Sequence, residues 1–229
     1  MEYFIIIIFL ITLVMILKFL FGYNKKQIEE IAKNQELDDM AKKYPNNIEM
    51  CKEYLKMLNN ETVTVEEDKT ANSSLYIAIS NKILIADVKE SFTRIQTIAH
   101  ECLHSIQDRK ILLFNFIYSN IYILYFLVIS ILKLCNILPY EMAFLVILIL
   151  GGFVYYFIRS YLEDDAMIKA RFLAKEYMES KKISSQEEID KIVKQFDKLN
   201  YLGIKSVNYT LCLTIMMEII IFCGICLIR

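Results

Sequence analysis

The chain has 229 residues, and 56% of them are hydrophobic, with no tryptophan, five glycines and two prolines. A composition this apolar excludes an ordinary soluble domain of the same length and predicts a membrane protein. The net charge of −1 comes without any basic cluster, so nothing indicates binding of nucleic acid.

Four segments are apolar enough to cross a lipid bilayer, which takes about 20 residues in a helix. They cover residues 3–22, 113–135, 140–159 and 207–228. The chain therefore divides into an N-terminal anchor, a polar block, a membrane hairpin, a second polar block and a C-terminal span, at 1–22, 23–112, 113–159, 160–206 and 207–229. We expect a mainly α, multi-pass membrane protein with about four transmembrane helices.

Charges beside the apolar segments predict the side of the membrane on which the polar blocks lie. Glu2 precedes the first segment and no small-residue cleavage site follows it, which argues against a secretory signal. Lys25–Lys26 follow this segment directly, and basic residues flank the others at Arg109–Lys110 and Arg159. Because such residues are enriched on the cytoplasmic side, we predict that both polar blocks face the cytosol at the cell membrane.

The first polar block begins with a helical pattern. Apolar residues recur at helical spacing over residues 25–44 and again over 47–59, and Pro45–Asn46 breaks the pattern between them. Residues 61–74 are polar, and we predict a loop there.

Two short runs of β-prone residues follow, at 75–79 and 83–86, on either side of Ser80-Asn81-Lys82. This arrangement predicts a β-hairpin. The edge of such a hairpin could pair with an extended peptide; alternatively, the hairpin only covers the core. From residue 89 to about residue 110 the pattern is helical again.

This last helix carries His100-Glu101-Cys102-Leu103-His104, which contains both histidines of the chain. Residues four apart lie on one face of a helix, so both imidazoles can reach one metal ion. Glu101 is placed to hold a metal-activated water and to take its proton. The pattern is typical of zinc-dependent hydrolases, although a five-residue pattern also occurs by chance.

A catalytic zinc ion normally has three protein ligands, so the two histidines need a carboxylate or a thiolate beside them. Three acids, Glu163, Asp164 and Asp165, stand where the chain leaves the membrane hairpin. Because that hairpin returns the chain to the side from which it entered, we predict that Glu163 completes a site for one zinc ion per chain. The acids could instead stabilise the N-terminus of a helix at 163–180 through their favourable interaction with the helix dipole.

The six cysteines do not indicate a disulfide framework. Four of them lie in or beside apolar segments, where thiols pack as small hydrophobic groups. Cys102 is two positions from His100, so it should point away from the histidine face. Unpaired thiols are expected in a cytosolic domain. If no acid is the third ligand, Cys102 or Cys51 is the next residue to consider.

One acid, Glu218, falls near the middle of the last apolar segment. An ionised carboxylate at the bilayer centre costs at least about 2.5 kcal/mol. Glu218 could therefore be protonated, be paired within the helix bundle or line a polar cavity, and a packing or assembly contact is the expected role. A role in a transport pathway is the alternative.

Two motifs together resemble a known family. His-Glu-Cys-Leu-His-Ser-Ile-Gln at 100–107 is followed, after the membrane hairpin, by Glu163-x-Asp165-Ala166-x-x-x-Ala170. This pattern resembles the YugP-like membrane zinc metallopeptidases, which are similar to gluzincins, and the resemblance extends over nearly the whole chain. It implies that His100, His104 and Glu163 are zinc ligands and that Glu101 is the catalytic base. Asp165 and Gln107 also match family positions; the resemblance assigns them no role, and they could support a ligand.

The chain departs from that family at two positions. Leu103 stands where the family usually has glycine, which leaves less room beside the metal or alters the packing behind the helix. Met167 stands where the gluzincin pattern has an aspartate that orients a histidine ligand. These departures bear on the level of activity more than on the kind of site.

The sequence as a whole predicts a small cytosolic zincin-like unit that hydrolyses peptide bonds of membrane or membrane-proximal proteins. Arg171, Tyr201 and Asn208 are candidates for stabilising the oxyanion. The alternative is a non-catalytic zinc-binding membrane adaptor or an inactive relative of such peptidases. A structural zinc site usually has a fourth protein ligand, and the sequence shows no obvious fourth, which favours the catalytic interpretation. The sequence does not indicate the oligomeric state.

Overall fold

The computed structural model describes residues 1–21, 25–68, 71, 73–86 and 91–228. In these residues the chain is mainly helical, with one small sheet, and it divides into two compact units. The apolar unit comprises Met1–Tyr23, Phe114–Tyr161 and Lys205–Arg229. The polar unit comprises Asn24–Leu113 and Leu162–Ile204.

Four long helices contribute to the apolar unit: α1 (Glu2–Phe21), α6 (Arg109–Leu134), α7 (Glu141–Lys181) and α8 (Gln186–Ile228). These four described helices are long and apolar enough to cross a membrane, so the prediction of four such segments is confirmed. Large apolar side chains, such as Phe9, Ile121 and Leu150, are exposed on them. Such a surface suits lipid better than water.

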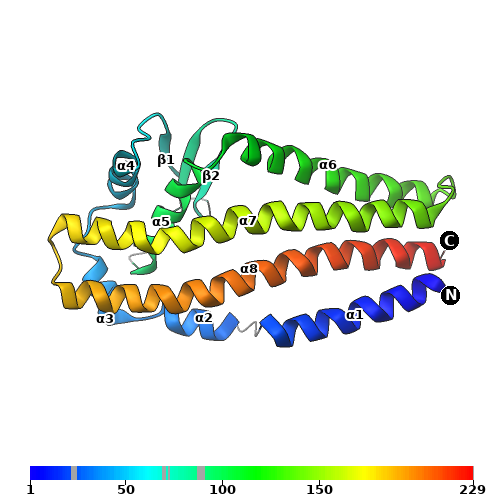
Figure 1. The fold of residues 1–229 in the computed structure, drawn as a ribbon, viewed down its shortest axis with the longest axis horizontal. Coiled ribbons are helices and arrows are strands. Elements are labelled where there is room, and N and C mark those ends of the chain that lie inside the picture. Colours follow the sequence, from blue (N-terminus) through cyan, green and yellow to red (C-terminus); the bar gives the residue numbers. More distant parts are fainter. Residues whose placement is uncertain (22–24, 69–70, 72, 87–90, 229) are drawn as a thin grey trace. The chain divides into compact units, whose positions relative to one another are not determined.

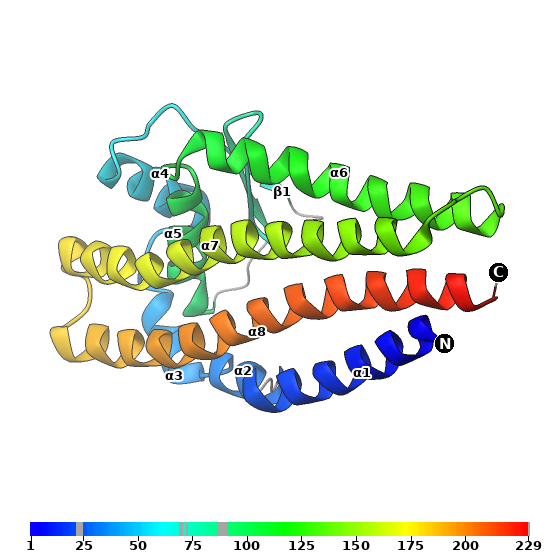
Figure 2. The ribbon, with the colours of Figure 1, turned by 45° about the vertical axis from the view of Figure 1, so that its right-hand side comes forward.

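Helices α7 and α8 continue without a break beyond the apolar segments of the sequence (Figures 1 and 2). The boundaries that we predicted at residues 160 and 206 therefore lie inside single helices. The glycine nearest the second boundary, Gly203, does not end α8 and instead allows close packing, because a Cβ there would lie 2.5 Å from Met167 Cε.

Glu218 lies on α8 inside the apolar unit and is half-buried. It lies near the hydroxyl of Tyr122 on α6, whose ring stacks on Tyr155 with centroids 5.7 Å apart. The Oε2 atom of Glu218 is buried and has no hydrogen-bond partner among the described residues. This position agrees with the prediction of a packing contact within the bundle.

Short helices begin the polar unit: α2 (Lys25–Ala32), α3 (Gln35–Ala41) and α4 (Asn47–Met57). The predicted break at Pro45–Asn46 is confirmed, since Asn46 Oδ1 accepts a hydrogen bond from Glu49 N at 2.9 Å and so caps α4. The helical pattern over 25–44 is confirmed, but it forms two helices, α2 and α3. Asn34 caps α3 in the same way, through Leu37 N at 3.2 Å, and so starts a second helix there.

A three-stranded sheet follows, formed by β1 (Thr64–Asp68), β2 (Leu75–Ile77) and β3 (Lys82–Ala86) in the order β1-β3-β2. Strands β2 and β3 form the predicted antiparallel hairpin. The loop predicted over 61–74 is wrong in part, because β1 pairs with β3 in parallel register. Its mostly exposed, acidic residues show no apolar alternation, and a Lys82–Glu66 ion pair of 2.7 Å links the two strands.

The core of the polar unit forms around α5 (Thr93–His104). Ile95, Ile98 and Cys102 are fully buried on one face of this helix, and the Tyr54 hydroxyl of α4 donates to Ile95 O at 3.0 Å. The helix predicted from 89 to about 110 is therefore shorter and separate from α6. Its first predicted residues, 89–90, lie outside the described part. Asp108 Oδ1 caps α6 by accepting a hydrogen bond from Lys110 N at 2.7 Å.

The turn between α7 and α8 in the polar unit carries a capping box. Glu188 N donates to Ser185 Oγ at 3.3 Å, and Ser185 N donates to Glu188 Oε2 at 3.0 Å. This reciprocal pair starts α8 and returns it antiparallel along α7 within the unit (Figure 1).

Candidate metal centre

One face of α5 packs into the core of the polar unit, and the opposite face carries the two histidines. Ile95, Ile98 and Cys102 point into the core of the polar unit, so the residues at His100 and His104 face away from it. Both histidines and Glu101 remain shielded from solvent, with His104 9% and Glu101 8% exposed. The helix therefore presents two imidazoles side by side in a water-poor setting.

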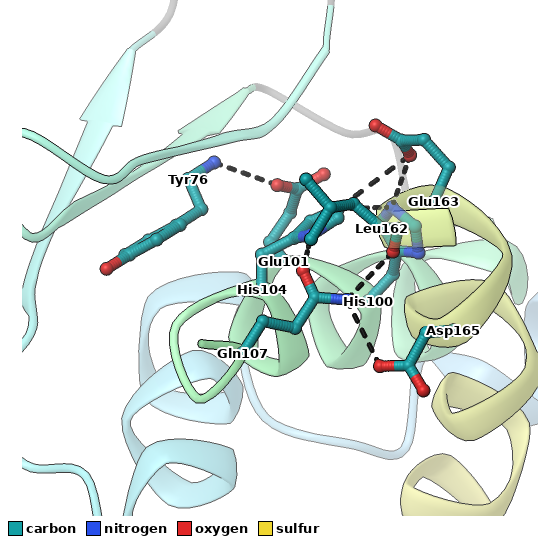
Figure 3. A network of polar contacts seen from close by, with 8 residues as sticks. All are labelled: Tyr76, His100, Glu101, His104, Gln107, Leu162, Glu163 and Asp165. Atoms are coloured by element: carbon teal, nitrogen blue, oxygen red, sulfur yellow. Dashed lines mark hydrogen bonds and ion pairs between the residues drawn. The ribbon is translucent and has the colours of Figure 1, made fainter. Parts of the chain in front are cut away.

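Glu163 of α7 joins this pair (Figure 3). His100 Nε2 lies 3.0 Å from His104 Nε2, and Glu163 Oε2 lies 3.4 Å from the first and 3.7 Å from the second. In a tetrahedral zinc site with bonds of about 2.0–2.2 Å, neighbouring donor atoms lie about 3.3–3.6 Å apart. The three measured separations bracket that spacing, so His100, His104 and Glu163 could hold a metal ion.

The two acids that follow Glu163 are not part of this metal cluster as found among the described residues. Asp165 leaves α7 on another side (Figure 3), where its Oδ1 pairs with Lys169 Nζ at 2.6 Å and its Oδ2 accepts from Gln107 Nε2 at 3.1 Å. Asp164 is half-buried. Of the three adjacent acids, the structure brings only Glu163 to both histidines.

His104 also has a partner at its second ring nitrogen. Gln107 Oε1 lies 2.8 Å from His104 Nδ1, and Gln107 Nε2 donates to Leu162 O at 2.8 Å (Figure 3). Burial disfavours a charge on His104, but Glu163 and Gln107 outweigh it and raise the pKa of the ring. The predicted support residues, Gln107 and Asp165, therefore contact each other and reach the site through His104.

Glu101 is held by the sheet. Its Oε2 accepts a hydrogen bond of 2.8 Å from Tyr76 N of β2 (Figure 3). Burial raises the pKa of Glu101, against the opposing effects of His100, His104 and the Tyr76 N–H. Sequence reasoning missed Tyr76, because a backbone donor has no residue signal; the hairpin directly before the motif helix was the only clue.

No cysteine belongs to the metal cluster found among the described residues. Cys51 and Cys102 contact each other, with their sulfur atoms 3.5 Å apart in the core, and burial raises the pKa of the Cys102 thiol. All six cysteines are free, which agrees with the expected absence of a disulfide framework. The donor residues of the cluster are His100, His104 and Glu163, and neither Cys102 nor Cys51 is among them.

The three residues that we considered as donors to an oxyanion are either paired with other side chains or exposed. Arg171 pairs with Asp197 of α8 and lies over the Phe172 ring, 4.3 Å from its centroid. Asn208 belongs to the apolar unit, where it accepts from Tyr156 and Ser160. Tyr201 is 61% exposed on α8. None of these positions identifies the oxyanion donor.

The two departures from the family pattern have separate structural consequences. Leu103 is buried in the core of the polar unit, so it affects the packing behind α5. Met167 packs its Cε close to Gly203. Among the residues that the structure describes, His100 Nδ1 has no hydrogen-bond partner, and position 167 carries methionine, which offers no carboxylate to it.

Comparisons with protein-family models, with curated proteins and with solved structures found no match. The chemistry of this site must therefore be argued from its own residues.

Proposed function

We propose that this chain is a membrane zinc metallopeptidase that hydrolyses peptide bonds of membrane or membrane-proximal proteins. The observation that carries the proposal is the triangle of donor atoms from His100, His104 and Glu163, with Glu101 adjacent on the same helix. It supports the same ligands and base as the resemblance to YugP-like metallopeptidases implies.

The donor set fits zinc. Two imidazole nitrogens and one carboxylate oxygen suit Zn²⁺, whereas Mg²⁺ and Ca²⁺ prefer oxygen ligands alone. When bound, the ion supplies Lewis acidity to a water molecule and to a peptide carbonyl. The cluster contains no fourth His, Cys, Asp or Glu among the described residues, which favours an open catalytic site over the purely structural zinc of an adaptor.

The residues of the chain divide the remaining work. Glu101 takes the proton of the attacking water and delivers it to the leaving amine, as general bases of this kind do. The Tyr76 N–H, in the middle of β2, orients the Glu101 carboxylate. The buried setting of Glu101 and His104 keeps bulk water from competing for these contacts.

A peptide is the substrate class that the surroundings favour. Strand β2 is an edge of the sheet, and its residue Tyr76 contacts Glu101 directly. An extended peptide paired with such an edge would bring its backbone to the base. Glu163 follows the apolar segment at 140–159 by only four residues in the sequence, which supports cleavage close to the membrane surface.

Chelation tests this function. Protein purified in detergent micelles should contain about one zinc ion per chain and hydrolyse casein or membrane-derived peptides. A chelator should abolish hydrolysis, and added zinc should restore it. Zinc-loaded protein that cleaves none of these substrates would favour the adaptor alternative, and hydrolysis that resists chelation would exclude a zinc mechanism.

We also propose that the polar unit faces the cytosol, which the lysines and arginines beside the apolar segments support. A reporter that is active only outside the cell should stay inactive when fused after residue 50 or residue 182. The same reporter should be active when fused after residue 229. The reverse pattern would place the polar unit on the outer face.

A further inference from the structure

The side chain of Gln107 lies in the turn between α5 and α6 and has partners at both ends of its amide. Its Oε1 lies 2.8 Å from His104 Nδ1. Its Nε2 lies 2.8 Å from Leu162 O and 3.1 Å from Asp165 Oδ2 (Figure 3). One glutamine therefore connects a candidate metal ligand on α5 with the helix that carries the third ligand.

The two partners on α7 determine which end of the amide faces which way. A peptide carbonyl and an ionised carboxylate can only accept hydrogen bonds, so the NH₂ group of Gln107 must face Leu162 and Asp165. Asp165 also pairs with Lys169 Nζ at 2.6 Å, so its carboxylate oxygens already accept from a positive charge. The amide oxygen is then left to face His104.

This orientation decides where His104 carries its hydrogen. An amide oxygen only accepts, so Nδ1 must be the protonated nitrogen, and Nε2 of the neutral ring keeps its lone pair. Nε2 is the atom that lies 3.0 Å from His100 Nε2 and 3.7 Å from Glu163 Oε2. His104 is thus already in the tautomer that can bind a metal ion.

The same amide also acts on the third ligand. Leu162 and Asp165 lie on either side of Glu163 in α7, within one turn of the helix. Two hydrogen bonds from Gln107 to this turn fix its rotation and its height against α5. The Glu163 carboxylate is therefore aimed at the histidines by a contact that does not involve Glu163 itself.

We propose that Gln107 is the positioning residue of the metal centre, which holds His104 in its Nδ1–H tautomer and clamps the Glu163 turn of α7 to the histidine helix. The proposal rests on the proposed function only in that the cluster binds zinc. His100 has no matching partner at Nδ1 among the described residues. The two histidines should therefore behave differently in the metal-free protein.

The test uses the full chain in detergent micelles. Because the chain has only two histidines, the imidazole region of its ¹⁵N spectrum is simple. In ¹⁵N NMR of the metal-free protein, recorded at a pH high enough to keep both rings neutral, His104 should show one fixed tautomer with no hydrogen on Nε2, assigned with a His100→Ala variant. Gln107→Met removes both ends of the amide at similar size. It should let His104 sample both tautomers and weaken zinc binding, measured by chelator competition, by about 10–100-fold.

Gln107→Glu separates the two roles. A carboxylate still accepts from His104 Nδ1, but it donates nothing to Leu162 and repels Asp165. This variant should keep the tautomer and still lose zinc affinity. The matched control is Gln96→Met. Gln96 lies on α5, the helix of the two histidines, but its side chain donates to Asn200 of α8. This change should leave the His104 tautomer and the zinc affinity nearly unchanged.

Two results would overturn the proposal. One is a His104 in the wild type that carries its hydrogen on Nε2 or exchanges freely between tautomers. The other is a folded Gln107→Met, checked by circular dichroism, with wild-type tautomer and zinc affinity. Since the tautomer is read without metal or substrate, a zinc-loaded wild type that hydrolyses nothing would refute the peptidase and leave the role of Gln107 intact.

Discussion

Glu101→Gln should lower hydrolysis by about 10²–10⁴-fold, to the background of the assay, while zinc content stays near one ion per chain. The amide cannot take a proton from water, but it has nearly the same shape as the carboxylate. Its oxygen can still accept from Tyr76 N, so the hydrogen bond that now measures 2.8 Å should persist. Turnover and metal analysis on one preparation measure both effects.

An exposed acid provides the control for this change. Glu67 lies on β1 in the same unit and is exposed, so Glu67→Gln should retain both zinc and activity. If purified Glu101→Gln, free of contaminating protease, hydrolyses substrate at the wild-type rate, Glu101 is not the base. If it loses zinc as well as activity, the carboxylate has a structural role in the site that the geometry does not show.

Glu163→Ala should abolish hydrolysis and weaken zinc binding by more than the roughly 100-fold that loss of a supporting residue can cost. The change removes the anionic donor and leaves two neutral imidazoles, too few protein ligands for a catalytic zinc ion. The structure supports this choice because Glu163 Oε2 lies 3.4 Å and 3.7 Å from the two Nε2 atoms. Chelator competition and metal analysis measure the loss.

The neighbouring acids are the matched controls for Glu163. Asp164→Ala should leave zinc content nearly unchanged, because Asp164 is outside the donor cluster found among the described residues. Asp165→Ala should have an intermediate effect, since it removes one acceptor of Gln107 but no metal ligand. If Glu163→Ala keeps its zinc while either neighbour loses it, the ligand is misassigned within the motif.

The candidate ligands and the base could be predicted from the sequence because their spacing is local. His100 and His104 share a face of any helix that contains them, and Glu101 follows from the same five residues. The four apolar segments are likewise a property of consecutive residues. The hairpin at β2 and β3 could be found for the same reason, since its strands adjoin one turn.

Other features depended on pairing between distant residues, which no local pattern encodes. Strand β1 has no apolar alternation and exists because β3 offers it a ladder of hydrogen bonds. The sequence placed three acids near the histidines, but only the rotation of α7 brings Glu163 to them and turns Asp165 toward Gln107. Sequence alone could favour Glu163 by arm length and resemblance, not by direction.

The same division explains the two residues around the site whose roles sequence reasoning did not assign. Tyr76 acts through its backbone N–H, which every residue except proline possesses, so its identity carried no signal. Gln107 was visible three positions after His104, but its role depends on Leu162 and Asp165, more than fifty residues further along the chain. Helical spacing determined which side chains could meet a metal ion; the packing of α7 against α5 decided which of them do, because hydrogen-bond partners are chosen by position in space and not by distance along the chain.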